Sequence, residues 1–467
     1  MGKQRIILST VCLAVLVAQI DTSVVNLVLR PIGATFGIGV SALQWVVDAY
    51  NLAYACLLLT GGTLGDLYGR RRLFVLGLCG FTAGSLLCGL APDAVWLIAG
   101  RALTGIGAAF ALPNSLAILT VAFPDDRARA RAIGVWASCN GIGLAIGPTL
   151  GGLLAEHAGW RSVFLVIVPV SVAGVAMALR AVPDSADPRG RRLDLAGQAL
   201  AVVALAGPVL AVIEAPAHGW TSPAILAASC LGAAALLLFL LVQRGREDGM
   251  MPLSLFGNPA FSAAMLVAAL MTFGTYAMLF LVPIYLQAVR GTPVDLVGMD
   301  MLPMALVFIV IARRSGAMAS AVGGRTMLAG GMTLSALGLL GLGLIEADTS
   351  LWHVELCIAA IGGGLGFAGG PVMAVAVANA PRDRAGTASG LANTARMLGA
   401  TLGVAVLGAV YASRAGQGVT DPALVLAGVR VAFRGSALSA VAGALVALCF
   451  VGRNALAAHG LARGRAR

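Results

Sequence analysis

Long apolar stretches separated by short polar segments run through the whole chain. A helix that crosses a lipid bilayer needs about 20 apolar residues, and the sequence contains about fourteen stretches of this kind. Their predicted limits are residues 6–29, 42–63, 73–91, 95–122, 131–155, 161–180, 193–214, 223–243, 259–288, 298–315, 325–346, 351–379, 386–411 and 431–453. Arg313 and Arg314 cut the tenth stretch short. The pattern predicts an all-α, polytopic membrane protein.

The composition agrees with this prediction. Hydrophobic residues make up 59% of the chain and charged residues 11%, whereas soluble domains contain about 25% charged residues. A net charge of +11 would suggest a nucleic-acid partner for a soluble protein. Here the basic residues lie in short loops between apolar stretches, which is typical of membrane proteins, so we expect no nucleic-acid partner.

Basic residues are distributed unequally between alternate loops. If the N-terminus is cytoplasmic, the cytoplasmic loops carry roughly four times as many basic residues as the outer loops. Arg101 and Arg396 are left inside predicted spans. The asymmetry predicts a multi-pass protein of the cell membrane with both termini in the cytoplasm and an even number of spans. The first stretch lacks a cleavage site of small residues and carries Asp21, so we expect it to be retained as a helix.

Neither the cysteines nor the histidines have the spacing of a metal site. The eight cysteines are scattered through apolar stretches without a C-x-x-C pair, and the four histidines are isolated. We therefore expect the cysteines to be small buried hydrophobic residues, and we expect neither disulfides nor a bound metal.

The densest polar segment lies between the second and third predicted spans. It reads Gly62-Thr63-Leu64-Gly65-Asp66-Leu67-Tyr68-Gly69-Arg70-Arg71-Arg72. Its glycines allow a tight turn and close helix approach. We expect Asp66 to lie just ahead of the next helix, where a helix N-terminus stabilises an anion.

The pattern G-x-L-x-D-x-x-G-R-[RK] in this segment resembles the signature loop between the second and third helices of the major facilitator superfamily of transporters. The resemblance implies a gate at the cytoplasmic ends of the helices, in which Asp66 and Arg70 form a charge cluster. The expected gating residues are Gly62, Asp66, Gly69, Arg70 and Arg71.

A weak internal repeat agrees with the two-halved architecture of that superfamily. The segments at 124–128 and 381–385 both read P-x-D-R-A, and each follows a helix that contains Gly-x-Gly and a proline. The offset between the copies leaves two extra spans near 193–243. We therefore expect a six-helix N-terminal half at 1–182, a linker with two inserted helices at 183–258, and a six-helix C-terminal half at 259–467.

Asp21, Asp48 and Arg101 lie inside predicted spans, with Asp48 about one turn into the second. An ionisable group at membrane depth is costly and marks a functional site by default. The alternative is that each aspartate lies near the membrane surface. Arg101 remains charged and needs a partner, for which Asp21 or Asp48 would serve in a structural ion pair or a proton relay. The segments around Asp21 and Arg101 resemble superfamily motifs, with Thr104 in place of a glutamine, and this favours the relay.

Glycines recur at every fourth position of the fifth predicted span. Gly143, Gly147 and Gly151 would form a smooth stripe for close helix packing, and Pro148 would allow a bend. Ordinary packing is one interpretation of this stripe. The full string G-x-x-x-G-P-x-x-G-G, which ends at Gly152, resembles the fifth-helix motif of antiporters. We therefore expect export, and we expect the stripe to seal against a helix of the other half.

The second half offers fewer polar residues at membrane depth. Asn393 and Arg396 lie mid-span and would contact either the gate or the substrate. Residues of the ninth span that would line a substrate pocket, unless they face lipid, are Phe273, Tyr276, Tyr285 and Gln287.

Taken with the resemblance, these features predict a fourteen-helix drug/proton antiporter with the major facilitator fold. It would export hydrophobic or amphipathic drugs or antibiotics, with protons and membrane lipid as further partners, and act as a monomer. No Walker sequence is present, and Gly364–Gly369 fits G-x-G-x-x-G only inside an apolar span. We therefore expect no cofactor and the proton gradient as the energy source. Alternatives are a lipid flippase, a nutrient symporter, or an embedded enzyme or receptor.

Overall fold

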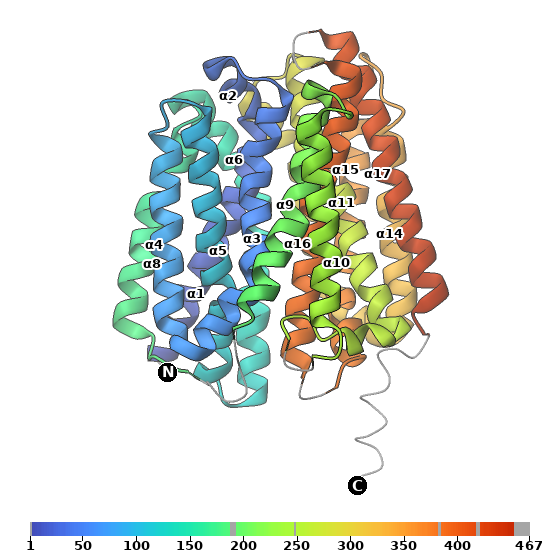
Figure 1. The fold of residues 1–467 in the computed structure, drawn as a ribbon. Helices are drawn as coiled ribbons and strands as arrows, with labels where there is room; N and C mark the ends of the chain where they lie inside the picture. Colours follow the sequence, from blue (N-terminus) through green and yellow to red (C-terminus); the bar gives the residue numbers. More distant parts are fainter. Residues whose placement is uncertain (1, 187–192, 247–248, 382–383, 417–420, 453–467) are drawn as a thin grey trace. The chain divides into compact units, whose positions relative to one another are not determined.

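The computed structural model of the protein describes residues 2–186, 193–246, 249–381, 384–416 and 421–452 (Figure 1). Within these ranges, fourteen helical segments are long and apolar enough to cross a membrane, which confirms the predicted all-α class and number of spans. Arg382 and Asp383 of the second P-x-D-R-A copy, residues 187–192 of the predicted linker and the arginines beyond 452 lie outside the described residues.

The spanning helices are α1 (Gly2–Val24), α3 (Val40–Tyr68), α4 (Arg70–Gly89), α5 (Ala94–Ala122), α6 (Asp126–Ala158), α8 (Ile167–Ala181), α9 (Leu195–His218), α10 (Pro223–Gln243), α11 (Pro259–Ala288), α13 (Leu302–Val322), α14 (Gly324–Leu342), α15 (Leu351–Ala378), α16 (Ala385–Ala415) and α17 (Pro422–Phe450). Shorter helices are η1 (Val25–Leu27), α2 (Leu29–Phe36), α7 (Ser162–Leu165), α12 (Val294–Asp300) and η2 (Leu253–Gly257). Helices α7 and α8 together form one span, and helices α12 and α13 together form another.

The tenth span is longer than the sequence pattern predicted. It extends over Val294–Ala319, and α13 continues through Arg313 and Arg314, whose side chains are exposed. The prediction that these two arginines cut the span short was wrong, because a charged pair on an exposed helix face does not interrupt the backbone hydrogen bonds.

The chain divides into two compact units. The first comprises Met1–Met250 and Gly291–Met299, and the second comprises Met251–Arg290 and Asp300–Arg467. In the first unit α4 and α3 pack on α5, α1 packs on α6 and α8, and α9 packs on α10 and α3. In the second unit α11 packs on α16 and α17, and α15 packs on α13 and α14.

Side-chain caps fix the beginnings of several helices. Asp93 accepts hydrogen bonds from the amides of Val95 and Trp96 at the start of α5. Asp125, in the first P-x-D-R-A copy, accepts from the amide of Ala128 at the start of α6. These contacts satisfy amides that an α-helix leaves without a partner in its first turn. The first copy therefore also contains a helix-start signal, at the variable position of the motif, whereas α16 begins after Arg384 without a side-chain cap.

The cysteines are not all buried. Cys12, Cys56, Cys88 and Cys357 are buried, but Cys79, Cys230 and Cys449 are exposed on helix surfaces, and all eight are free. The prediction of burial was wrong for the exposed three because a bilayer accepts a weakly polar thiol on the outside of a helix as readily as the interior does.

Candidate functional site

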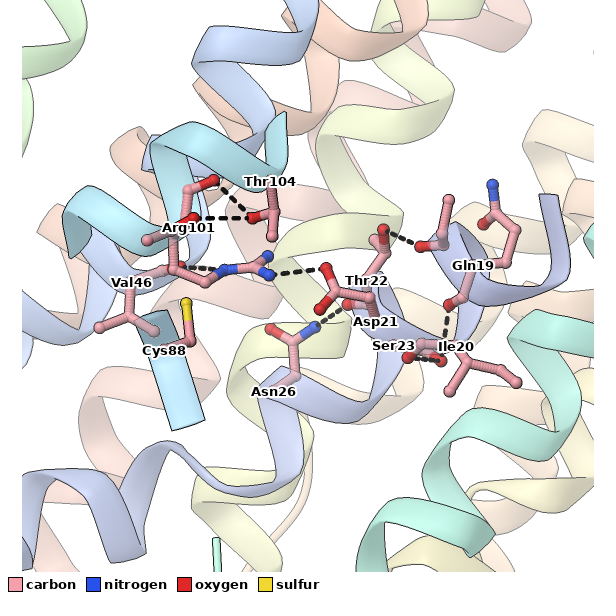
Figure 2. Close-up of polar contacts among 12 residues, drawn as sticks. Gln19, Ile20, Asp21, Thr22, Ser23, Asn26, Val46, Cys88, Arg101 and Thr104 are labelled. Atoms are coloured by element: carbon pink, nitrogen blue, oxygen red, sulfur yellow. Dashed lines mark hydrogen bonds and ion pairs between the residues drawn. The ribbon is translucent and has the colours of Figure 1, made fainter. Parts of the chain in front are cut away.

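Arg101 of α5 and Asp21 of α1 form a buried ion pair (Figure 2). The Nη1 atom of Arg101 lies 2.6 Å from Oδ2 of Asp21, and the two residues are 1% and 0% exposed. The Nε atom of Arg101 donates to the carbonyl of Val46 on α3 at 2.9 Å. The guanidinium also lies over the ring of Tyr50, 4.7 Å from its centroid. Arg101 thus connects α1, α3 and α5.

The end of α1 is built from local hydrogen bonds around Asp21. Thr22 donates to the carbonyl of Ala18 at 2.8 Å, and Asn26 donates to the carbonyl of Thr22 at 3.1 Å. Short side chains that return to the backbone in this way favour the tightening of α1 into η1. The second carboxylate oxygen of Asp21, Oδ1, is buried and makes no hydrogen bond with any described residue.

Asp48 lies deeper in its helix than the sequence suggested. Helix α3 begins at Val40, so Asp48 is more than two turns from the start, not one, and it is completely buried. Neither carboxylate oxygen accepts a hydrogen bond of ordinary geometry from the described residues, although Asn51 lies beside it one turn later. Gln44 and Asn51, at 0% and 1% exposure, complete a buried polar row along α3.

The polar row lies on its own face of α3. Val46 and Tyr50, one turn apart, face Arg101. Asp48 is two residues from each of them, which places it about 200° around a helix of 3.6 residues per turn. The structure therefore brings Asp21 and Arg101 together and leaves Asp48 outside that pair.

A third face of α3 binds α9. Ser41 donates to the carbonyl of Ile213 at 3.0 Å, and Trp45 donates through Nε1 to Oε1 of Glu214 at 2.7 Å. Gln198 donates to the carbonyl of Cys56 at 2.9 Å nearer the other end. Glu214 is a site residue that was not expected from the sequence; its signal is a carboxylate at the end of an otherwise apolar span. Helix α9 is thus fixed to the helix that carries Asp48.

The expected gating loop connects α3 and α4. Asp66 lies in the last turn of α3, and Arg70 is the first residue of α4. Their side chains form an ion pair of 2.7 Å between Nη2 and Oδ1. The prediction that a helix N-terminus stabilises Asp66 was wrong, because a carboxylate at a helix C-terminus and a cation at an N-terminus both oppose the helix dipoles. The two charges compensate each other instead.

The segment after α8 is bound to this loop. Arg72 pairs with Asp184 at 3.1 Å, the amide of Arg70 donates to the carbonyl of Ser185 at 2.8 Å, and Arg71 donates to the carbonyl of Val182 at 3.4 Å. Gly69 has φ +111°, and a Cβ there would lie 2.7 Å from Oδ1 of Asp184. The first residues of the predicted linker are therefore part of the loop assembly.

Two glycines that were not singled out make the closest contacts of α3 with α5. A Cβ on Gly61 would lie 2.1 Å from the carbonyl oxygen of Ala109, and one on Gly65 would lie 1.6 Å from Oδ1 of Asn114. At Gly62 the nearest atom is Cβ of Pro113 at 3.7 Å, an ordinary contact. Gly62 therefore does not mediate the close approach of these helices.

The glycine stripe of α6 packs on α1. A Cβ on Gly143 would lie 2.9 Å from the carbonyl oxygen of Leu16, one on Gly147 would lie 1.8 Å from Oγ of Ser23, and one on Gly151 would lie 1.8 Å from Cγ2 of Val24. The expectation that these three glycines contact the other half was wrong, since α1 belongs to the same half. The stripe is instead the contact surface for the helix that carries Asp21.

The end of the antiporter-like string contacts α12 rather than α1. A Cβ on Gly152 would lie 2.7 Å from the carbonyl oxygen of Val294. In return, a Cβ on Gly298 would lie 2.4 Å from the carbonyl oxygen of Pro148. Each helix thus provides one glycine to a close crossing of α6 and α12.

In the second unit, Arg396 of α16 lies beside α11. Thr272 donates through its hydroxyl to the backbone carbonyl of Arg396 at 2.6 Å. The buried Nε atom of Arg396 makes no hydrogen bond with a described residue. Asn393, one turn earlier, is half-buried.

The expected pocket residues of α11 differ in exposure. Phe273 and Tyr276 are half-buried, whereas Tyr285 and Gln287 are 0% and 3% exposed. The hydroxyl of Tyr285 donates to the backbone carbonyl of Glu346 at 3.0 Å. Tyr285 therefore holds the segment before α15, and Phe273 and Tyr276 are the better-placed candidates for ligand contact.

Comparisons with known proteins identify relatives over most of the chain. The family model of the Major Facilitator Superfamily matches residues 11–404. The multidrug resistance protein Stp of Mycobacterium tuberculosis is 38% identical over 397 residues, covering 84% of this chain and 73% of that protein. The methylenomycin A resistance protein of Bacillus subtilis is 34% identical, with coverages of 86% and 87%. The tetracenomycin C resistance and export protein of Streptomyces glaucescens is 36% identical, with coverages of 89% and 77%.

A solved structure agrees in fold. A bacterial homologue of the human lysosomal transporter Spinster, in an inward-facing and unoccupied conformation, matches with a TM-score of 0.66 and 19% identity. The match covers 98% of this chain and 97% of the other. At that identity the likeness establishes the fold alone.

Proposed function

We propose that this chain, which belongs to the major facilitator superfamily of membrane transporters, exports hydrophobic or amphipathic compounds across the cell membrane in exchange for protons. The chain is a multi-pass transporter and not an enzyme. The names of its relatives, which include resistance proteins for methylenomycin A and tetracenomycin C, support antibiotics or similar compounds as substrates.

The complete burial of Asp48 without a counter-charge is the observation that carries the proposal of proton coupling. Burial favours the protonated form of a carboxylate, and a partner charge reverses that preference. Asp21 has such a partner in Arg101, which stays charged, so removing the Asp21 charge would leave a buried guanidinium unpaired. Asp48 has no counter-charge among the described residues of the site. It is therefore the group that we assign to the uptake and release of the proton.

The Asp21–Arg101 pair has a different role in this proposal. It holds α1, α3 and α5 in one arrangement and fixes Val46 and Tyr50, which flank Asp48 in sequence. A small change at this pair would shift α3 and with it the surroundings of Asp48. Arg101 thus acts on coupling by positioning α3 rather than by carrying the proton.

Several structural features support outward transport and the orientation. The close packing of α6 on α1 and α12 suits a surface that prevents an ion leak, as the antiporter-like motif implies. The positive-inside asymmetry supports cytoplasmic termini.

We further propose that the loop residues Asp66 and Arg70 close the cytoplasmic side, and that Phe273, Tyr276, Asn393 and Arg396 contact the substrate. The six-helix halves at 1–182 and 259–467, with 183–258 between them, are the proposed functional division of a monomer.

The test is transport by purified protein in liposomes, after a growth screen with a panel of toxic compounds has supplied a substrate. We expect an imposed pH gradient to drive substrate against its concentration gradient, and we expect added substrate to move protons in the opposite direction. Movement of protons and substrate in the same direction would identify a symporter. Transfer of labelled phospholipid between leaflets, without proton-driven movement of any compound from the panel, would identify a flippase.

A further inference from the structure

A groove of about 680 Å³ lies between α1 and α8 at the ends that carry Lys3 and Arg180. It is far along α1 from the buried site, since Asp21 lies near the opposite end of that helix. The groove is lined by Gly2, Lys3, Ile6, Ala173, Ala176, Met177, Arg180 and Ala181. All of these residues belong to the first unit.

The charged part of the lining consists of two cations. Lys3 is in the first turn of α1, and Arg180 is in the last turn of α8. The lining contains no carboxylate. Both side chains are exposed, and neither forms an ion pair with any residue in the described part of the chain. Two cations without a carboxylate in the same lining favour the binding of an anion.

The rest of the lining is apolar. Ile6 and Met177 provide larger side chains, and Ala173 and Ala176 provide small ones. The cations lie where the apolar runs of α1 and α8 begin and end, at the depth at which a membrane changes from polar headgroups to acyl chains. A free phosphate ion would use the cations but would leave the apolar walls unused.

We propose that this groove binds an anionic phospholipid, with its phosphate between Lys3 and Arg180 and an acyl chain along Ile6, Ala176 and Met177. Basic pockets between membrane helices are suited to anionic headgroups, and the apolar walls continue the hydrocarbon of the bilayer. A lipid in this position bridges α1 and α8 and so stabilises the helix that carries Asp21. With the orientation proposed above, the bound lipid belongs to the cytoplasmic leaflet.

Native mass spectrometry of the detergent-solubilised full-length protein tests this site. The protein is titrated with phosphatidylglycerol, phosphatidylethanolamine or inorganic phosphate. We expect one phosphatidylglycerol to bind tightly, phosphatidylethanolamine to bind more weakly, and inorganic phosphate not to bind detectably. Each cation near an anionic headgroup contributes roughly fivefold in affinity, so the double variant Lys3→Gln/Arg180→Gln should bind phosphatidylglycerol roughly thirtyfold more weakly.

Two further variants separate a built groove from general surface charge. Ala176→Phe keeps both cations but fills the floor of the groove, and it should also weaken phosphatidylglycerol binding at least tenfold by occupying the place of the acyl chain. It tests the site independently if the double variant fails to fold. Arg313→Gln/Arg314→Gln removes the same charge from exposed positions on α13 and should bind normally.

Three results would overturn the proposal. The first is equal affinity of the parent for the two phospholipids. The second is an equal loss in the Arg313/Arg314 double variant, which would mean that only surface charge attracts lipid. The third is unchanged binding by Ala176→Phe. Because the readout is lipid binding and not transport, a failure here is distinguishable from a failure of the proposed antiport.

Discussion

The Nη1 atom of Arg101 lies 2.6 Å from Oδ2 of Asp21, although the two residues are 80 positions apart in the chain. A buried pair of this kind is weak support for stability while it is intact, because desolvation opposes the attraction of the charges. Removing one partner of the pair is strongly destabilising, because the other charge then stays buried without a counter-charge. We therefore expect a single substitution in this pair to lower the stability of the protein much more than a double substitution does.

Asp21→Asn should destabilise the protein by roughly 3–5 kcal/mol, because it leaves the Arg101 guanidinium without its counter-charge. The double variant Asp21→Leu/Arg101→Met should recover most of that loss. The measurement is thermal unfolding in detergent, arranged as a double-mutant cycle. If the single and double variants were equally unstable, the pair would not be the source of the effect.

The ion pair between Asp66 and Arg70 should influence which side of the transporter is open. Attraction within a partly buried pair is on the order of 1–3 kcal/mol, which is enough to shift a two-state equilibrium severalfold. Asp66→Asn should therefore increase the fraction of inward-open molecules. The readout is the labelling rate of a cysteine introduced in the cytoplasmic cavity of a variant without reactive native cysteines.

The control for this experiment is Asp93→Asn. It removes the same charge from the cap of α5, where asparagine still serves as a cap. Unchanged labelling in Asp66→Asn, or an equal change in Asp93→Asn, would contradict a role of Asp66 in the gate.

The glycine stripe of α6 predicts a position-dependent effect of a single methyl group. Gly151→Ala would place Cβ 1.8 Å from Cγ2 of Val24, so the Val24 side chain or the two helices must shift. Overpacking of this kind costs about 1–3 kcal/mol. We expect a lower melting temperature and a faster passive proton leak in liposomes. Gly134→Ala, on the same helix, meets nothing within 4 Å and should leave both unchanged.

Two outcomes would contradict this explanation of the stripe. If Gly151→Ala transported and melted as the parent does, the packing would tolerate a side chain. A proton leak of equal size in Gly134→Ala would show that the loss of any glycine from α6 is sufficient.

The hydrogen bond from Trp45 to Glu214 should link α9 to transport. Trp45→Phe removes the donor and leaves a half-buried carboxylate without it, at a cost of about 1–3 kcal/mol. Because α9 then holds α3 less firmly, we expect slower proton-driven transport as well as lower stability. Trp220→Phe, at an exposed residue beyond α9, is the control. Lower stability with unchanged transport would show that the contact is structural only.

Much of the fold follows from local signals, but the partners in the site do not. Apolar runs near 20 residues predict the spans, and the charge on Arg101 predicts a buried acid as its partner. Which acid it is depends on the rotation of α3, which turns Val46 and Tyr50 toward Arg101 and Asp48 away from it. Residues two apart in sequence can have opposite environments on a helix, and only the packing of several helices fixes the difference.

The packing partner of the glycine string likewise could not be predicted from the sequence. Its spacing predicts a smooth face on α6, and the structure shows one. The identity of the packed partner, α1 for most of the stripe and α12 at Gly152, depends on contacts between segments that are distant in the chain. Asp66 was misplaced for a local reason, since α3 continues through the glycines to Tyr68 where the sequence suggested an earlier end.

The most direct test of proton coupling at Asp48 compares two transport modes of one variant in liposomes. We expect Asp48→Asn to lose substrate accumulation driven by a pH gradient by at least tenfold, while exchange of labelled for unlabelled substrate without a gradient stays within about twofold of the parent. Asp48→Glu, which keeps a titratable group, should retain part of the driven transport. Retained exchange would show that the variant is folded and binds substrate. Full accumulation by Asp48→Asn under the same pH gradient would contradict the assignment of the proton to Asp48.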